Sequence, residues 1–188
     1  MPTADRAPRL RGRRRGVVTV YASLIVTLAA LAQILNLPNL STHREARSAI
    51  MISATADTVW ALLTDLTHYT VWNPYISPAK GNIKEGAPLE LTLHNGDQTV
   101  IIAETVLSVK PDHELSWGGW MLDHNLQRTL TFSIDQVGPD QVWLDAHEVF
   151  QGILLPFVGN IPDDAQHGLD EMVRALRSAA ELKPPHSP

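Results

Sequence analysis

Three charged side chains interrupt rows of apolar residues that a β-strand would place on one face. Alternate positions in 125–134 are Leu126, Arg128, Leu130, Phe132 and Ile134, and alternate positions in 141–150 are Val142, Leu144, Ala146, Glu148 and Phe150. Glu104 interrupts the row of Val100, Ile102 and Val106 in the same way. With a turn near Gly138, Arg128 is predicted to lie opposite Glu148. A charge on an inward face is costly unless it is paired or hydrated.

This pattern has two interpretations. Arg128 and Glu148 could line an internal cavity and orient the polar group of a ligand. They could instead form a structural ion pair at the rim of the sheet, or a different register could turn both to solvent.

Catalytic and metal-binding motifs are not evident. The chain has no G-x-S-x-G, no glycine-rich phosphate loop and no cysteine, so we expect no cofactor. Eight histidines are present, but without HExxH or a His-x₃-His pair we expect no metal site. Asp145 and His147 share one strand face and could act as a base and its orienting group, although an ordinary outer face is the simpler interpretation.

Aromatic residues cluster at the expected ends of helices and strands. They are Trp60, Tyr69, Trp72, Tyr75, Trp117, Trp120 and Trp143. Aromatic bodies with polar tips suit the mouth of an apolar pocket, and ordinary core packing is the alternative.

The elements that must position these residues follow from periodicity and turn chemistry. A helix is predicted after an N-cap at Thr55, with Val59, Leu62, Leu63 and Leu66 as its buried stripe. Strands are predicted at 44–53, 75–83, 89–93, 98–109, 113–120, 125–134 and 141–150, with a hairpin turn at Asn95-Gly96. Their short connections imply antiparallel pairing. A helix at 163–183 is predicted to bury Ala165, Leu169, Met172, Leu176 and Ala179. The expected class is α+β, with about seven antiparallel strands around the C-terminal helix.

The N-terminal end has a different composition. Residues 1–16 contain six arginines and one aspartate, a charge of +5, and 17–37 is an apolar run without charge. About 20 such residues at 1.5 Å each span a hydrocarbon layer of ~30 Å. We expect a retained transmembrane helix with the N-terminus cytoplasmic and the body extracytoplasmic. The alternative is a signal segment cleaved near Ala32, after which the body is exported free.

The chain after the basic tail is acidic. The net charge is −5, so residues 17–188 carry −10, and an acidic body argues against nucleic acid as a partner.

The expected organisation is a basic tail at 1–16, the apolar segment at 17–37, a linker at 38–43, one domain at 44–183 and a tail at 184–188. The oligomeric state is not indicated.

Three stretches of the chain match one known pattern: ISATADTVWALLTDLTHYTVWNPYI, HEVFQGILLP at 147–156 and DEMVRALRSAAE at 170–181. Through them, residues 46–183 resemble the START-like, or polyketide cyclase/dehydrase-like (SRPBCC), superfamily. It implies a helix-grip fold with a deep hydrophobic cavity between the sheet and the last helix, capped by the short helices after the first strand. The N-terminal segment lies outside the resemblance.

Together these observations favour a membrane-tethered domain that binds a small hydrophobic molecule, such as a lipid, isoprenoid or polyketide-like compound. The expected ligand-binding residues are Tyr69, Trp72, Tyr75, Leu91, Glu104, Trp117, Arg128, Leu130, Phe132 and Glu148, with Leu89 and Leu93 as further candidate walls. The alternative is a cyclase or dehydratase that uses Glu148 or His147 in acid-base chemistry, and a scaffold for a protein partner is a third possibility. No catalytic residue is assigned.

Overall fold

A computed structural model describes residues 42–95, 98–159 and 161–182 of this chain. The elements are β1 (His43–Ile52), α2 (Ala56–Thr64), η1 (Leu66–His68), α3 (Tyr69–Trp72), β2 (Ile76–Gly81), β3 (Pro88–Asn95), β4 (Gln98–Lys110), β5 (Glu114–Met121), β6 (Leu126–Gly138), β7 (Gln141–Gln151), η2 (Leu155–Phe157) and α4 (Ile161–Leu182). This succession confirms the predicted α+β class and the positions of the seven strands.

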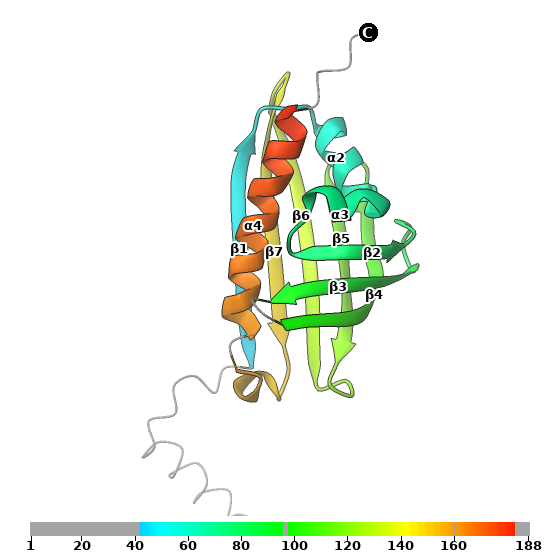
Figure 1. The fold of residues 1–188 in the computed structure, drawn as a ribbon, viewed down its shortest axis with the longest axis vertical. Helices are drawn as coiled ribbons and strands as arrows, with labels where there is room; N and C mark the ends of the chain where they lie inside the picture. The colour runs from blue at the N-terminus through cyan, green and yellow to red at the C-terminus, as the bar shows by residue number, and fades with distance from the viewer. Residues whose placement is uncertain (1–41, 96–97, 160, 183–188) are drawn as a thin grey trace, which may run out of the picture. The chain divides into compact units, whose positions relative to one another are not determined.

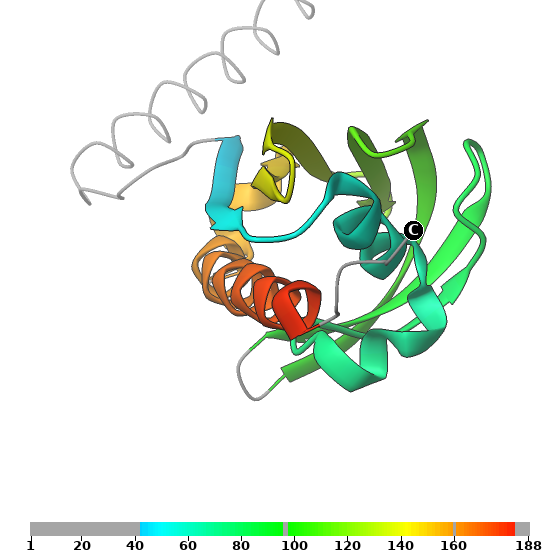
Figure 2. The ribbon, with the colours of Figure 1, turned by 90° about the horizontal axis from the view of Figure 1, so that it is seen from above.

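The strands of the described residues form one sheet in the order β1-β7-β6-β5-β4-β3-β2, and every pair is antiparallel. The helix α4 runs alongside β1 and β7, whereas β2 and β3 cross its direction (Figure 1). Seen from above, the sheet curls around α4 (Figure 2). The architecture is therefore the helix-grip fold, in which the concave face of the sheet and the last helix share one core.

Local chemistry explains the first helix and the strand faces. Thr55 caps α2 by accepting a hydrogen bond from the backbone N–H of Thr58 at 3.3 Å, as predicted. In β6 and β7 every second residue is buried along most of the strand, and Arg128 and Glu148 lie in those buried rows.

The long helix α4 buries one stripe and is tied to the edge strand. Four of its five predicted core residues are fully buried: Ala165, Leu169, Met172 and Leu176. The side chain of Gln166 donates to the backbone oxygen of Arg47 at 3.0 Å and accepts from its N–H at 2.9 Å. These two bonds satisfy backbone groups on the otherwise unpaired edge of β1.

The structure corrects two predictions. Arg128 pairs with Phe150, and Glu148 pairs with Leu130, so the predicted register between β6 and β7 is wrong by two residues. The reason is that the turn lies after Gly138 and an irregularity separates Gln136 from Gly138. A shift of two residues keeps every side chain on its predicted face. The predicted linker also ends too late, because His43 already belongs to β1.

Several predictions concern residues outside the described ones. These are the basic tail, the apolar segment 17–37, most of the linker, the turn at Asn95-Gly96 and the tail at 184–188. Among the residues that the structure does describe, no helix has the length and apolar composition needed to span a membrane.

Gly168 of α4 allows the ring of Tyr75 to approach the helix. A Cβ at position 168 would meet the Tyr75 ring, with Cε2 only 2.6 Å away. Tyr75 is 1 % exposed, so its ring has little room to move.

Gly168→Ala should therefore destabilise the protein by about 1–3 kcal/mol, because the added methyl group overpacks the contact with Tyr75. In an unobstructed helix the same substitution is stabilising, by up to about 1 kcal/mol. Urea unfolding measures the difference, and a gain in stability would show that Tyr75 does not press on this helix.

Candidate functional site

A single cation lies between two carboxylates in the core. Arg128 Nη1 donates to Glu104 Oε1 at 2.7 Å, and Arg128 Nε donates to Glu148 Oε1. The exposed fraction is 1 % for Arg128, 0 % for Glu148 and 4 % for Glu104. The three residues come from the inward rows of β4, β6 and β7, which the sequence had identified, and β5 lies between β4 and β6. We call them the buried charge cluster.

Tyr75 completes the hydrogen bonding on one side of the cluster. Its hydroxyl donates to Glu148, 3.1 Å from each carboxylate oxygen. The backbone around Tyr75 is fixed by Asn73, whose Oδ1 accepts from the N–H of Tyr75 at 3.0 Å and from that of Ile76 at 2.9 Å. Tyr75 therefore connects the segment after α3 to the buried charges.

Two polar atoms of the cluster have no hydrogen-bond partner within the described part of the chain: Arg128 Nη2 and Glu104 Oε2. An unsatisfied buried donor or acceptor costs about 1–3 kcal/mol, and more when it is charged. The Nη2 group of the buried Arg128 guanidinium is therefore available to donate a hydrogen bond to another acceptor.

The protonation of the cluster follows from its burial. Burial raises the pKa of Glu148 above its usual value, against the opposing effect of Arg128. Burial disfavours the charge of Arg128, but Glu104 and Glu148 together raise the pKa of Arg128 well above its usual value. Burial and the neighbouring Glu148 also raise the pKa of the Tyr75 hydroxyl. At neutral pH Arg128 is charged and Tyr75 is neutral.

A cavity of about 200 Å³ lies next to the cluster, where Arg128 and Tyr75 reach its wall. Its apolar lining consists of Leu93, Val100, Met121, Leu122 and Phe150, and its further polar residues are Gln98 and Asp164. A water molecule occupies about 30 Å³ of liquid, so this space corresponds to roughly seven waters. It is smaller than the roughly 300–1,000 Å³ of common ligand pockets. Its size would accommodate a small molecule or one end of a longer one.

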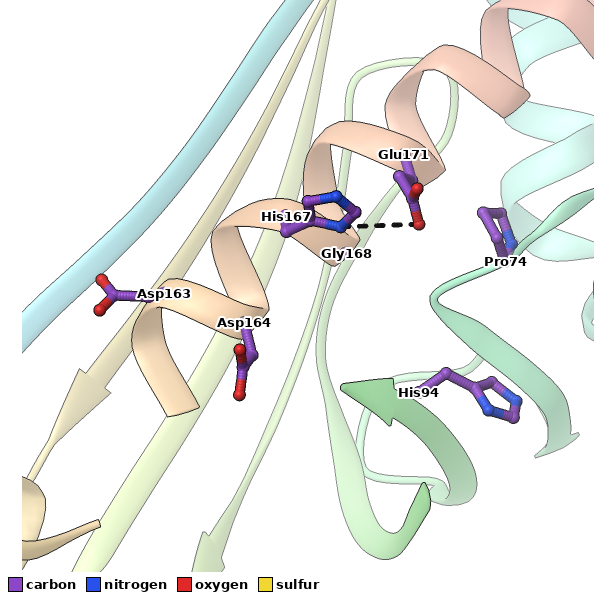
Figure 3. A pocket seen from close by; sticks show the side chains of 7 residues that line it. All are labelled: Pro74, His94, Asp163, Asp164, His167, Gly168 and Glu171. Carbon is purple, nitrogen blue, oxygen red and sulfur yellow. Dashed lines mark ion pairs between the residues drawn. The ribbon is translucent and has the colours of Figure 1, made fainter. Parts of the chain in front are cut away.

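A second, larger pocket of about 570 Å³ lies beside it, and most of its lining residues are polar in type. Figure 3 shows side chains of α4 on one side of this pocket and Pro74 and His94 on the other; the lining residues are Pro74, His94, Asp163, Asp164, His167, Gly168 and Glu171. Asp164 lines both pockets. The dashed line in Figure 3 marks the 3.7 Å ion pair between His167 and Glu171. Three carboxylates give this outer pocket a negative character.

The other predicted ligand-binding residues lie in the core and outside the lining of this cavity. Leu91, Leu130, Trp117 and Phe132 are fully buried, and the rings of Trp117 and Phe132 are 5.4 Å apart. Their packing fills much of the space between sheet and helix, and the cavity beside Arg128 is correspondingly small.

The two aromatics before Tyr75 pack against each other. Tyr69 is fully buried, donates to the backbone oxygen of Leu63 at 2.7 Å, and contacts Trp72 edge-on at 5.0 Å between ring centroids. Neither Tyr69 nor Trp72 lines the cavity beside Arg128.

Sequence reasoning missed six cavity-lining residues: Gln98, Val100, Met121, Leu122, Phe150 and Asp164. Two of them carried a usable signal, because Val100 shares the inward row of Glu104 and Phe150 shares that of Glu148. The other four lie at strand ends and in the first turn of α4, where alternation gives little guidance.

The rival acid-base residue, His147, lies on the opposite face of β7 from Glu148. It is partly exposed and contacts Glu45 at 3.0 Å. Asp145 of the same face is paired with Arg47, so the suggested Asp145–His147 pair is engaged with β1. Among the described residues, no three His, Asp or Glu side chains are grouped so as to hold a metal ion.

The curled sheet around α4, with a small internal cavity and a buried charge cluster, gives this chain a helix-grip architecture. Residues 43–181 match the family described as "Polyketide cyclase / dehydrase and lipid transport", and the chain belongs to that family. No curated protein matches the chain.

Solved structures with the same fold include a START superfamily protein from Mycobacterium smegmatis, with a TM-score of 0.61 and 22 % identity over 73 % of this chain and 97 % of that chain. A truncated norcoclaurine synthase from Thalictrum flavum matches with a TM-score of 0.55 and 16 % identity over 76 % and 96 % of the two chains. The di-domain ARO/CYC BexL from the BE-7585A biosynthetic pathway matches with a TM-score of 0.62 and 14 % identity, over 90 % of this chain and 60 % of that chain. At these identities the likeness concerns the fold alone.

The buried charge cluster should make Arg128 indispensable to the fold. Arg128→Met would leave Glu104 and Glu148 buried without a cation, and the expected loss is about 3–5 kcal/mol in the free energy of unfolding. Arg47→Met is the matched control, because Arg47 pairs with Asp145 on the exposed face of β1, and its effect should be much smaller.

If Arg128→Met does not fold, the triple variant Glu104→Gln, Arg128→Met, Glu148→Gln tests the same point. Removing all three charges should restore folding, as seen by circular dichroism and denaturant unfolding. A loss for Arg128→Met no larger than that for Arg47→Met would contradict the electrostatic role of the cluster.

The ionisation of Glu148 should also make the stability of the folded protein depend on pH. Because its pKa is raised in the folded protein, its contribution to stability is fully present below its ordinary pKa of 4.5 and is lost as the pH rises through the raised value. The stability of Glu148→Gln relative to wild type should therefore increase as the pH rises above about 4.5.

Glu45→Gln provides a control of opposite sign. Hydrogen bonds from His43 and His147 lower the pKa of Glu45, so its contribution is present above pH 4.5 and is lost as the pH falls. The relative stability of Glu45→Gln should decrease slightly from about pH 3 to about pH 5. Parallel pH profiles for the two variants would refute the assignment for Glu148.

Proposed function

We propose that this domain binds a small, uncharged, largely apolar molecule in the cavity beside Arg128. Apolar side chains would cover most of the ligand, and Arg128 would donate a hydrogen bond to an oxygen acceptor such as a carbonyl or hydroxyl group. The single observation that carries the proposal is that Arg128, which lines an apolar cavity, has a buried Nη2 group without a hydrogen-bond partner in the described part of the chain.

The charge count favours an uncharged ligand. Arg128 already faces two carboxylates, so the cluster carries −1 when both are ionised and 0 when Glu148 is protonated. Neither state leaves a surplus positive charge to balance a ligand carboxylate. The acidic outer pocket would repel an anion further.

The family provides independent support at a coarser level. Its description includes both lipid transport and polyketide cyclase or dehydrase activity. Both kinds of function handle apolar molecules with oxygen-containing groups, which is the ligand chemistry proposed for this cavity.

The proposal includes a location. The apolar segment 17–37 after the arginine-rich tail would tether the domain to a membrane, with the domain on the extracytoplasmic side. A cleaved leader would export the same domain without the tether.

A second candidate is an enzyme that uses Glu148 as an acid. The raised pKa of Glu148 and its hydrogen bond from Tyr75, a cavity-lining residue, favour it. The name of norcoclaurine synthase shows that this fold also supports catalysis. Turnover of a bound compound that is lost in folded Glu148→Gln would favour the enzyme over the binding protein.

Binding can be tested with 2-acetylnaphthalene, a neutral aromatic ketone, and 2-naphthoate, a carboxylate of nearly the same shape. The ketone should bind at least about tenfold more tightly by calorimetry, a difference of about 1.4 kcal/mol. Equal or tighter binding of 2-naphthoate would contradict the uncharged-ligand proposal.

Val100→Phe should reduce binding of the ketone strongly, because Val100 lines the cavity. Ile101→Phe is the matched control, since Ile101 is the next residue of β4 and points to the outer face. If both variants bind the ketone like wild type, the cavity beside Arg128 is not the binding site.

A further inference from the structure

Two adjoining segments at one end of the domain expose large apolar side chains to water: the end of β5 with the turn after it, and the segment after β7 that includes η2. The exposed fraction is 53 % for Trp120, 48 % for Leu122, 67 % for Ile153 and 75 % for Phe157. We call these four residues the apolar rim. Scattered exposed apolar residues are common, but four within two neighbouring segments form a patch.

Hydrogen bonds hold the two segments together. The N–H of Leu154 donates to the backbone oxygen of Asn125 at 3.5 Å, which joins the loop after β7 to the turn after β5. The N–H of Gly152 donates to the backbone oxygen of Thr42 at 2.9 Å, so the start of β1 lies at this same end. Figure 1 shows this end at the bottom, with β1 beginning there and β7 ending there.

The rim adjoins the cavity. Leu122 lines the cavity beside Arg128 and is also half exposed in the rim. Whatever covers the rim therefore also lies at this end of the cavity.

The preceding chain indicates what covers it. The apolar run 17–37 ends five residues before Thr42. Five residues reach at most about 18 Å, at about 3.5 Å each. If 17–37 crosses a bilayer, as proposed above, the end of the domain that contains Thr42 stays within about 18 Å of the membrane boundary.

The charges around the rim specify the kind of membrane contact. The stretches 120–125 and 151–164 contain no Lys or Arg, and they include Asp123, Asp163 and Asp164. These two stretches offer no cationic side chain to anionic lipids, so their contact with a membrane would depend on insertion of apolar side chains.

We propose that the apolar rim inserts into the surface of a lipid bilayer and presents the Leu122 end of the cavity to the lipid. Trp120 has the amphipathic ring that is enriched at this boundary. In this arrangement the domain exchanges its ligand with the bilayer directly. The proposal rests on the tether at 17–37 and extends beyond ligand binding itself.

Single nitroxide labels can test this proposal in the full chain, because the sequence contains no cysteine. Ile153→Cys and Phe157→Cys place labels in the rim. Val137→Cys is the control, because Val137 is 53 % exposed near the turn between β6 and β7, away from the rim. Each labelled chain is reconstituted into phosphatidylcholine vesicles, and circular dichroism verifies its fold.

The labels at 153 and 157 should be several-fold more accessible to oxygen than to a water-soluble nickel complex, and the label at 137 should show the reverse. Adding phosphatidylserine should not deepen the rim labels. Rim labels as water-exposed as the control, insertion that requires phosphatidylserine, or spectra broadened by a second copy would each overturn the proposal. Failure of the full chain to associate with vesicles would overturn the tether as well.

Discussion

One buried cation held by two carboxylates is the constraint on which the rest of this structure depends. Arg128 bonds to Glu104 of β4 and Glu148 of β7 from its own position on β6. Three strands must therefore curve so that these side chains meet, and Tyr75 must reach Glu148 from the segment after α3. Such a cluster is expensive to bury and is easily replaced by apolar residues in proteins that need only stability. Its retention beside a cavity is consistent with a role in recognising a ligand.

The cluster also explains the kind of site that the fold provides. Trp117 and Phe132 pack much of the interior, and Arg128 lines part of the open space that remains. Apolar walls supply non-directional affinity, whereas one unpaired donor supplies orientation. Because the positive charge is already neutralised, the donor of the proposed site would select ligands by hydrogen bonding rather than by net charge. The proposed uncharged ligand and the negative outer pocket both follow from this balance.

Much of the fold was predictable because strand alternation and turn residues are local signals. The inward faces of β6 and β7, the cap at Thr55 and the buried stripe of α4 all follow from spacing along the chain. The register between β6 and β7 was misplaced by two residues because it depends on the turn after Gly138, where an irregularity shifts the pairing. Most of the cavity was not predictable, since residues such as Leu122 and Asp164 meet only through the tertiary fold. Alternation indicated that Arg128 and Glu148 face inward, but it could not show which Arg128 nitrogen stays unpaired.

The most direct test is a crystal structure of the protein soaked with 2-acetylnaphthalene. We expect the carbonyl oxygen of the ketone to lie at hydrogen-bond distance, about 2.7–3.2 Å, from Arg128 Nη2, and its rings to lie against Phe150 and Leu93. A ketone bound elsewhere on the domain, or Arg128 with all its N–H groups paired within the protein, would contradict it.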